Sequence, residues 1–219
     1  MRLSQLEFGS LLSYSPRGNS IEILHARDFM IALKTEKFVE DPKTLKPVLM
    51  SKWVAETIQH DRGKLPFSSY FHPNAILVPT PKSSLMKPDT LWVPERIASA
   101  LAKIGLGKVL PCIRRVKSVL KSASSLPRER PTAVDHYNSF RVFGSLSEPD
   151  EIVLVDDVVT RGATLLGAAN RLVEAFPKTC IRAFAVMRTI SNPSEFNQLY
   201  DPCKGTIELR ESDDTLRRP

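Results

Sequence analysis

The stretch EIVLVDDVVTRGATLLGAANRL, residues 151–172, constrains the fold of this chain more than any other. Its four apolar residues, 152–155, lead directly into the adjacent carboxylates Asp156 and Asp157, and a short turn with threonine and glycine follows. A continuous apolar run bounded by polar residues is typical of a buried strand in a parallel sheet. Residues 163–176 then have the character of a helix that ends before a proline. The stretch therefore predicts a strand, a turn and a helix, with two like charges at the carboxyl end of the strand.

The rest of the chain alternates between short apolar runs and segments with helical spacing. Besides the run at 152–155, the runs that predict core strands lie at residues 75–78, 108–113 and 181–187. The segments that predict helices lie at residues 51–59 and 95–104. Strands alternating with helices predict an α/β fold, in which a mostly parallel, twisted sheet is flanked by helices.

The two ends of the chain have weaker patterns. The sequence predicts short strands around residues 21–24 and 29–33. The polar segment 191–219 is expected to cover an edge of the sheet.

Composition limits the environment and the partners. No apolar run approaches the ~18 residues that span a bilayer, and the first residues lack the pattern of a signal peptide. The three cysteines, Cys112, Cys180 and Cys203, are odd in number and far apart, so we interpret them as free thiols. The expected location is the cytoplasm, without a membrane. The formal charge of +7 favours anionic partners, such as phosphorylated metabolites, nucleic acid or an acidic protein.

The acidic pair and the turn after it together predict a sugar-phosphate site. Ligands of open α/β sheets bind beyond the carboxyl ends of the strands, where Asp156 and Asp157 are expected. Carboxylates accept hydrogen bonds from sugar hydroxyls or from a hydrated metal ion. The turn from Thr160 to Thr164 opens a helix, whose first N–H groups bind phosphate. Gly162 allows a positive φ or a close approach of the backbone to a ligand.

Other interpretations of the acidic pair remain open on these residues. Strands that end in two acids occur in ATPases, but the chain has no G-x-x-x-x-G-K-[ST] loop; its nearest text, at residues 105–109, lacks the hydroxyl residue. Receiver domains also cluster acids but lack the T-x-G-A-T turn. An acidic loop whose Asp or Thr side chain simply caps the helix is the structural alternative.

The text EIVLVDDVVTRGAT resembles the phosphoribosyl pyrophosphate (PRPP) motif of type I phosphoribosyltransferases, and Arg161 is the one departure, at a position usually small. The resemblance implies that family's fold, with a small hood and a mobile lid loop. It implies that Asp156 and Asp157 bind the ribose hydroxyls and contact Mg²⁺ through water, so that Mg²⁺ is bound together with PRPP. The remaining PRPP-binding positions are Val158, Val159, Thr160, Arg161, Gly162, Ala163 and Thr164.

The resemblance also assigns a pyrophosphate site and a lid. Residues 114–142 occupy the place of the lid, and their text is similar to the ComF-type, amidophosphoribosyltransferase-like branch, although the cysteine cluster common in that branch is missing. Lys117 is a candidate catalytic residue with Asp156 and Asp157. The candidate pyrophosphate ligands are Thr80, Pro81, Lys82, Lys117 and Lys121, with Arg128 and Arg130 as further basic residues of the lid. For His136, which lies in or near this segment, the favoured interpretation is a surface residue, and a role in proton transfer is the alternative.

The resemblance implies a domain organisation and two candidate functions. Residues 1–47 are expected to form a hood or appendage, 48–190 the phosphoribosyltransferase core, and 191–219 a C-terminal extension. The first function is transfer of the phosphoribosyl group of PRPP to a nitrogen nucleophile, with release of pyrophosphate. The alternative is a catalytically silent module that binds PRPP or a nucleotide in regulation or in a DNA-associated process. Members of the family are often dimers, so a homodimer is a candidate assembly.

Overall fold

The computed structural model describes residues 2–40, 44–87, 89–120, 130–144 and 148–219. Within these ranges, seven strands form one central sheet in the order β11-β10-β1-β9-β8-β4-β5. The five strands from β1 to β5 in this order pair in parallel, whereas β10 and β11 pair antiparallel. The strands of this sheet are β1 (Gln5–Tyr14), β4 (Ile76–Pro79), β5 (Lys108–Val109), β8 (Glu151–Val159), β9 (Cys180–Thr189), β10 (Tyr200–Leu209) and β11 (Thr215–Arg218).

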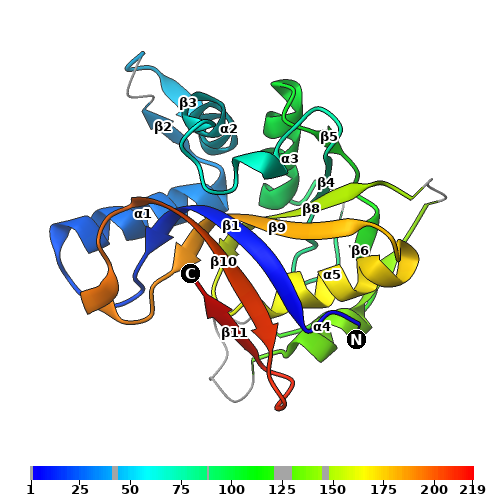
Figure 1. The fold of residues 1–219 in the computed structure, drawn as a ribbon. Helices are drawn as coiled ribbons and strands as arrows, with labels where there is room; N and C mark the ends of the chain where they lie inside the picture. The colour runs from blue at the N-terminus through cyan, green and yellow to red at the C-terminus, as the bar shows by residue number, and fades with distance from the viewer. Residues whose placement is uncertain (1, 41–43, 88, 121–129, 145–147) are drawn as a thin grey trace.

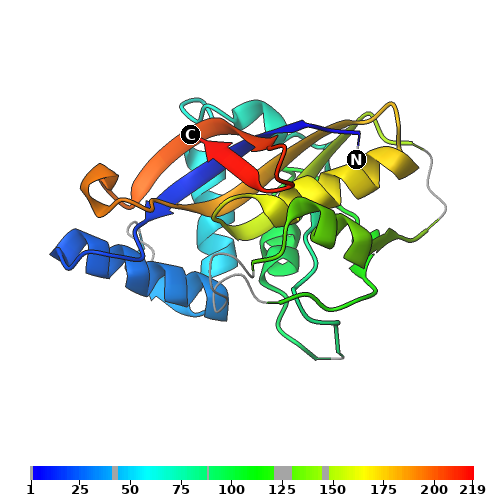
Figure 2. The same ribbon diagram turned by 90° about the horizontal axis from the view of Figure 1, so that it is seen from below.

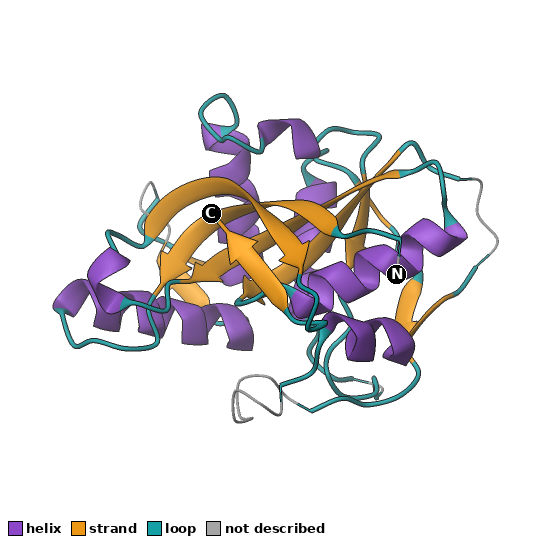
Figure 3. Ribbon diagram, turned by 60° about the horizontal axis from the view of Figure 1, so that its bottom comes forward, coloured by secondary structure: helices purple, strands orange, loops and turns teal. Residues whose placement is uncertain are grey.

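Helices cover both faces of this sheet (Figures 1 and 3). The α-helices are α1 (Ile21–Thr35), α2 (Met50–Asp61), α3 (Val93–Lys103), α4 (Ala133–Ser139) and α5 (Ala163–Ala175). Two small hairpins add β2 (Phe38–Glu40) with β3 (Pro47–Leu49), and β6 (Ile113–Arg115) with β7 (Phe140–Val142). Short 3₁₀ turns lie at η1 (Ser68–Tyr70) and η3 (Pro193–Glu195). The predicted α/β class, with a mostly parallel sheet between helices, is confirmed.

The core strand β8 is buried on both faces because its side chains alternate between two hydrophobic clusters. Val153 and Val155 pack into the cluster with α2 and α3. Ile152 and Leu154 pack into the opposite cluster, with α5. Figure 2 shows α5 and α4 together on that second face. A strand with two buried faces needs apolar residues at every position, which is why its sequence reads as an unbroken apolar run.

The N-terminal segment differs from its prediction. Residues 21–35 form the helix α1, so the strands predicted at 21–24 and 29–33 are wrong. The Ser20 side chain accepts a hydrogen bond from the Ile23 N–H and caps the helix, and only one face of the helix is buried. Each apolar run contributes one residue to that face, Ile23 and Leu33, whereas Ile21, Leu24 and Ile31 are exposed.

The strand β1 lies in the middle of the sheet, between β10 and β9, although the sequence did not predict it. Its serines and Gly9 interrupt the apolar pattern, yet Ser10 and Ser13 are fully buried. Segments 1–47 and 191–219 thus both supply strands to the central sheet, and β11 of the second is its edge strand, as expected. The three-part division of the chain stays a prediction.

The single strand predicted at 108–113 is two strands, β5 and β6, in different sheets. Pro111 has no N–H to donate to a ladder, and the Cys112 N–H donates to the Leu110 carbonyl oxygen at 2.8 Å in a tight bend. The three cysteines are free, as predicted. Among the described residues, no helix combines the length and the apolar character that a membrane crossing requires.

Gly9 is a packing requirement of the central strand β1. A Cβ atom there would lie 2.6 Å from Cγ of Phe67, which is fully buried. We expect Gly9→Ala to lower the free energy of unfolding by about 1–3 kcal/mol, as overpacked cores do. Gly63→Ala is the matched control, because a Cβ there meets no atom within 4 Å. Urea unfolding of both variants measures the difference, and equal stability would contradict this packing.

Candidate functional site

A cleft with a volume of about 700 Å³ opens at the carboxyl ends of the parallel strands. The strand β4 ends at Pro79, opposite Val155, so the next residues of β8 extend past their neighbour on that side. These residues are Asp156 and Asp157, which both line the cleft. The cleft thus forms where an early strand end leaves the tip of β8 accessible.

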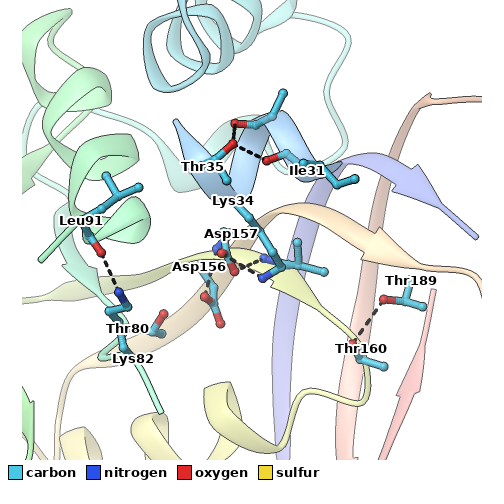
Figure 4. Close-up of polar contacts among 12 residues, drawn as sticks. Ile31, Lys34, Thr35, Thr80, Lys82, Leu91, Asp156, Asp157, Thr160 and Thr189 are labelled. Carbon is cyan, nitrogen blue, oxygen red and sulfur yellow. Dashed lines mark hydrogen bonds and ion pairs between the residues drawn. The ribbon is translucent and has the colours of Figure 1, made fainter. Parts of the chain in front are cut away.

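Backbone groups fix the orientation of the two carboxylates. Asp156 Oδ1 accepts from the Asp157 N–H at 2.9 Å, and Asp157 Oδ1 accepts from the Val158 N–H at 2.6 Å. Asp157 Oδ2 forms an ion pair with Lys34 Nζ at 3.1 Å (Figure 4). Lys34 lies in the last turn of α1, so a helix from the N-terminal segment contributes a cation to the acidic pair.

The acidic pair and Lys34 have coupled electrostatics. Burial raises the pKa of the Asp156 carboxyl above its usual range, and the adjacent Asp157 charge raises it further. Burial alone would lower the pKa of Lys34, but the Asp157 and Asp156 carboxylates outweigh it and raise the pKa, so Lys34 stays charged. The protein therefore holds Asp156 in a position where ionisation is costly until a hydrogen-bond donor or a cation arrives.

The turn after β8 presents the N-terminus of α5 to the same cleft. Gly162 is the N-cap residue, with φ of 88°, and it provides no side chain to cap the helix. The first N–H groups of α5 therefore have no side-chain cap, and with the helix dipole they suit an anion. The interpretation of an Asp or Thr as the cap of this helix is wrong, because the glycine occupies that position.

The C-terminal hairpin of β10 and β11 holds this turn in place. A Cβ atom at Gly162 would lie 2.6 Å from Cδ1 of Ile207 on β10. Arg161 forms an ion pair with Asp214 at 2.5 Å, and Arg217 Nε on β11 donates to the Thr160 carbonyl oxygen at 2.8 Å. Arg161, the departure from the family motif, thus has a partner within the protein although it also borders the cleft.

A second loop, after β4, forms the opposite wall. The Thr80 N–H donates to the Val155 carbonyl oxygen at 2.9 Å, and the Trp92 indole donates to the Thr80 carbonyl oxygen at 2.7 Å. Lys82 Nζ donates to the Leu91 carbonyl oxygen at 2.8 Å (Figure 4). These contacts hold the loop rigidly, with Thr80, Pro81 and Lys82 all lining the cleft.

The structure brings most of the predicted site residues together. The predicted residues that line the cleft are Thr80, Pro81, Lys82, Asp156, Asp157, Val158, Val159, Thr160, Arg161, Gly162, Ala163 and Thr164. Arg130 also lines it. Lys117 is exposed and is absent from the lining. Lys121 and Arg128 lie outside the described residues.

Lys34, Arg115 and His136 are among the lining residues that sequence reasoning did not assign to the site. The prediction that His136 is a surface residue is wrong, since its exposed fraction is 2%. Arg115 is 5% exposed. Both belong to segments that are distant in sequence from the acidic pair, so no local pattern indicated their position.

The described residues could hold a divalent cation only if a bound ligand supplied some of the oxygen atoms around it. No group of three or more His, Cys, Asp or Glu that could hold a metal occurs in the described part of the chain. Mg²⁺ is commonly held by one or two carboxylates together with substrate phosphates and water. Asp156 and Asp157 fit that pattern, because each has one oxygen held by a backbone N–H, although the second oxygen of Asp157 is paired with Lys34.

Comparison with known proteins adds no assignment: no protein-family model matches the sequence, and no curated protein matches it significantly. Function must therefore be inferred from the residues of the cleft.

The raised pKa of Asp156 predicts a pH-dependent cost in stability. In the unfolded chain the carboxyl has a pKa of about 3.9; because the folded value is higher, folding takes up a proton and stability falls as the pH rises through this interval. We expect Asp156→Asn to be more stable than the wild type at pH 8 by about 1 kcal/mol or more, since one pKa unit corresponds to about 1.4 kcal/mol. The difference should shrink towards pH 4.

Thermal and urea unfolding across this pH range measure the effect, and the exposed Asp28→Asn serves as control. An Asp156→Asn variant less stable than the wild type at pH 8 would contradict the burial argument.

Proposed function

We propose that the protein binds PRPP together with Mg²⁺ and transfers its phosphoribosyl group to a nitrogen nucleophile, in the manner of a type I phosphoribosyltransferase of the ComF-like branch. One observation carries the proposal: a single cleft contains two fixed carboxylates and, one turn later in the chain, an uncapped helix N-terminus. This is the pairing that a ribose 5-phosphate requires. The motif resemblance at residues 151–164 also supports it.

The two halves of the sugar phosphate have separate partners in the proposal. Asp156 and Asp157 accept hydrogen bonds from the ribose 2- and 3-hydroxyls, and Asp157 Oδ2 does so beside its ion pair with Lys34. The N–H groups at the start of α5 and the Thr164 hydroxyl donate to the 5-phosphate. Hydrogen bonds donated by the sugar hydroxyls reduce the repulsion between the two carboxylates. This reduction makes the binding of the ligand more favourable.

The loop after β4 is the proposed site of the pyrophosphate. Lys82 provides a cation at this wall, and Arg115 lies behind the loop. Mg²⁺, held by Asp156 and Asp157 with ligand phosphates, would neutralise charge on the leaving group. Positive groups that are already in place where negative charge develops provide the largest catalytic contribution of such a site.

The reaction needs little acid–base chemistry from the protein. The bond between C1 and the pyrophosphate oxygen breaks, a bond between C1 and the acceptor nitrogen forms, and the nitrogen loses its proton to solvent. The cleft contributes orientation of the two reactants and stabilisation of the departing pyrophosphate. The acceptor has a natural place against the residues that segments 1–47 and 191–219 add to the wall, namely Tyr14, Pro16, Arg17 and Ser191.

Pyrophosphate release tests the proposal directly. The full chain is mixed with PRPP, Mg²⁺ and a panel of bases and amines, and released pyrophosphate is measured. Release with one class of acceptor supports the transferase. Saturable PRPP binding without release for any acceptor would instead favour the silent binding module, and absence of PRPP binding would reject both.

Two substitutions should strongly weaken PRPP binding in a protein that still folds. Asp157→Ala deletes a hydroxyl acceptor, and Gly162→Val displaces the phosphate turn, because valine resists the positive φ and its Cβ would clash with Ile207. We expect affinity for PRPP to fall on the order of a hundredfold in each, since an error of ~1 Å in a binding group can cost that much.

Gly105→Ala is the control for Gly162→Val, because Gly105 also has a positive φ but has open space around it and does not line the cleft. Calorimetric titration with PRPP and Mg²⁺ measures all three variants. Normal binding by both site variants would show that this loop is not the ligand site.

A further inference from the structure

Behind the cleft, one buried guanidinium contacts the loop after β4 directly and is linked to the turn at residues 160–164 through His136. Arg115 on β6 donates from Nε to the Lys82 carbonyl oxygen at 2.5 Å, in the loop after β4. Its Nη1 donates to the Ser139 hydroxyl, and its Nη2 lies 3.2 Å from His136 Nδ1 on α4. The guanidinium also stacks on the Phe140 ring, with Cζ 4.2 Å from the ring centroid. All nitrogens of Arg115 thus have defined partners inside the protein.

The contact with Arg115 fixes the tautomer of His136. A guanidinium can only donate, so His136 Nδ1 must accept, and the proton of the neutral ring must then lie on Nε2. Nε2 is 3.3 Å from the Thr164 hydroxyl oxygen, so Nε2–H donates to that oxygen. Burial, followed by the Arg115 charge, lowers the pKa of His136 to about 3, which keeps the ring neutral near pH 7. The Thr164 hydroxyl therefore receives a hydrogen bond, and its own proton is directed away from His136.

The sequence makes room for this contact at Gly167. A Cβ atom there would lie 2.7 Å from both the Ala133 carbonyl oxygen and His136 Cβ. A glycine in the interior of a helix costs about 1 kcal/mol relative to alanine, so its presence in α5 has a packing reason. It lets α4 pack closely on α5, and the two helices lie side by side in Figure 2. His136 thereby comes within 3.3 Å of the Thr164 hydroxyl in the first turn of α5.

We infer that Arg115 and His136 are positioning residues that orient the Thr164 hydroxyl as a donor to the 5-phosphate of the ligand, while the same guanidinium holds the Lys82 carbonyl on the pyrophosphate side. The inference deepens the proposed function and rests on it. Neither side chain needs to touch the ligand. Through their contacts, the two proposed anion-binding turns, at residues 80–83 and 160–164, are joined by a chain of hydrogen bonds through Arg115 and His136.

Two near-isosteric substitutions separate the two hydrogen bonds of His136. His136→Gln places an amide N–H near the Nε2 position and can still donate to Thr164. His136→Asn places an amide oxygen near the Nδ1 position, so it can accept from Arg115 but cannot reach Thr164. We expect His136→Asn to weaken binding of ribose 5-phosphate by about tenfold, the effect of one lost hydrogen bond. Inorganic pyrophosphate should bind with unchanged affinity, and His136→Gln should retain most of the affinity for ribose 5-phosphate.

A double-mutant cycle tests whether His136 affects ligand affinity through the Thr164 hydroxyl. In a Thr164→Val background the hydroxyl is gone, so His136→Asn should cause no further loss of ribose 5-phosphate affinity. Calorimetric titrations with ribose 5-phosphate and with inorganic pyrophosphate, both with Mg²⁺, provide these values. Equal losses for both ligands, or additive losses in the cycle, would indicate a merely structural role and overturn the inference.

The tautomer can be observed without any substitution. In the wild-type protein labelled with ¹⁵N-histidine, we expect the His136 ring to be neutral, with its proton on Nε2. A proton on Nδ1, or a charged ring, in a protein that binds ribose 5-phosphate overturns the inference and leaves the proposed function intact. A wild-type protein that binds neither ribose 5-phosphate nor pyrophosphate overturns the proposed function, and this inference with it.

Discussion

Repulsion between two adjacent carboxylates, held at the tip of a strand that is buried on both faces, is the constraint on which the rest of the cleft depends. Asp156 and Asp157 cannot move apart, because β8 is paired on one side with β9 as far as Val159. Two backbone N–H groups and Lys34 offset part of the repulsion, while burial first and the neighbouring Asp157 charge second keep the pKa of Asp156 raised. Costly charge arrangements of this kind concentrate at functional sites, and a ligand that donates hydrogen bonds would relieve this one.

The segments outside the predicted core are physically part of the site. Lys34 comes from α1, and Ile207, Asp214 and Arg217 come from the C-terminal hairpin. The hairpin holds the turn at residues 160–164 in place, whereas α1 supplies the charge of Lys34 to the carboxylates. The central position of β1 explains how both ends of the chain reach the cleft, since β1 pairs with β9 on one side and with β10 on the other. Truncation at either end would therefore remove more than a surface appendage.

The parts of the site that the sequence could predict are those determined locally. The apolar run of β8, the acids at its end and the glycine turn are contiguous in the sequence. Because β8 is buried on both faces, its residues 152–155 are all apolar, and an unbroken apolar run predicts a strand. The positive φ of Gly162 could also be predicted from the sequence, because glycine is the residue that most readily adopts it.

The parts that could not be predicted depend on contacts between distant segments. Lys34 approaches Asp157 across 123 positions of sequence, and its helix has short apolar runs that resemble strands. His136 looks like any histidine of a polar loop until α4 packs on α5 at Gly167. The strand β1 was hidden because its buried serines make its pattern resemble a surface segment. In each case tertiary packing, and not local propensity, decides where the side chain lies.

The mixture of charges in the cleft also limits what kind of anion can occupy it. The uncapped start of α5, Lys82 and Arg115 favour phosphate groups, but the carboxylates between them disfavour a continuous row of phosphates. A nucleic-acid strand presents one charge at every step of its backbone, so part of it would lie against Asp156 and Asp157. A small ligand with phosphates at its two ends and hydroxyls between them matches the alternation of positive, negative and positive groups along the cleft. The net positive charge of the chain is therefore a weaker guide to the occupant of this cleft than the order in which its charges are arranged.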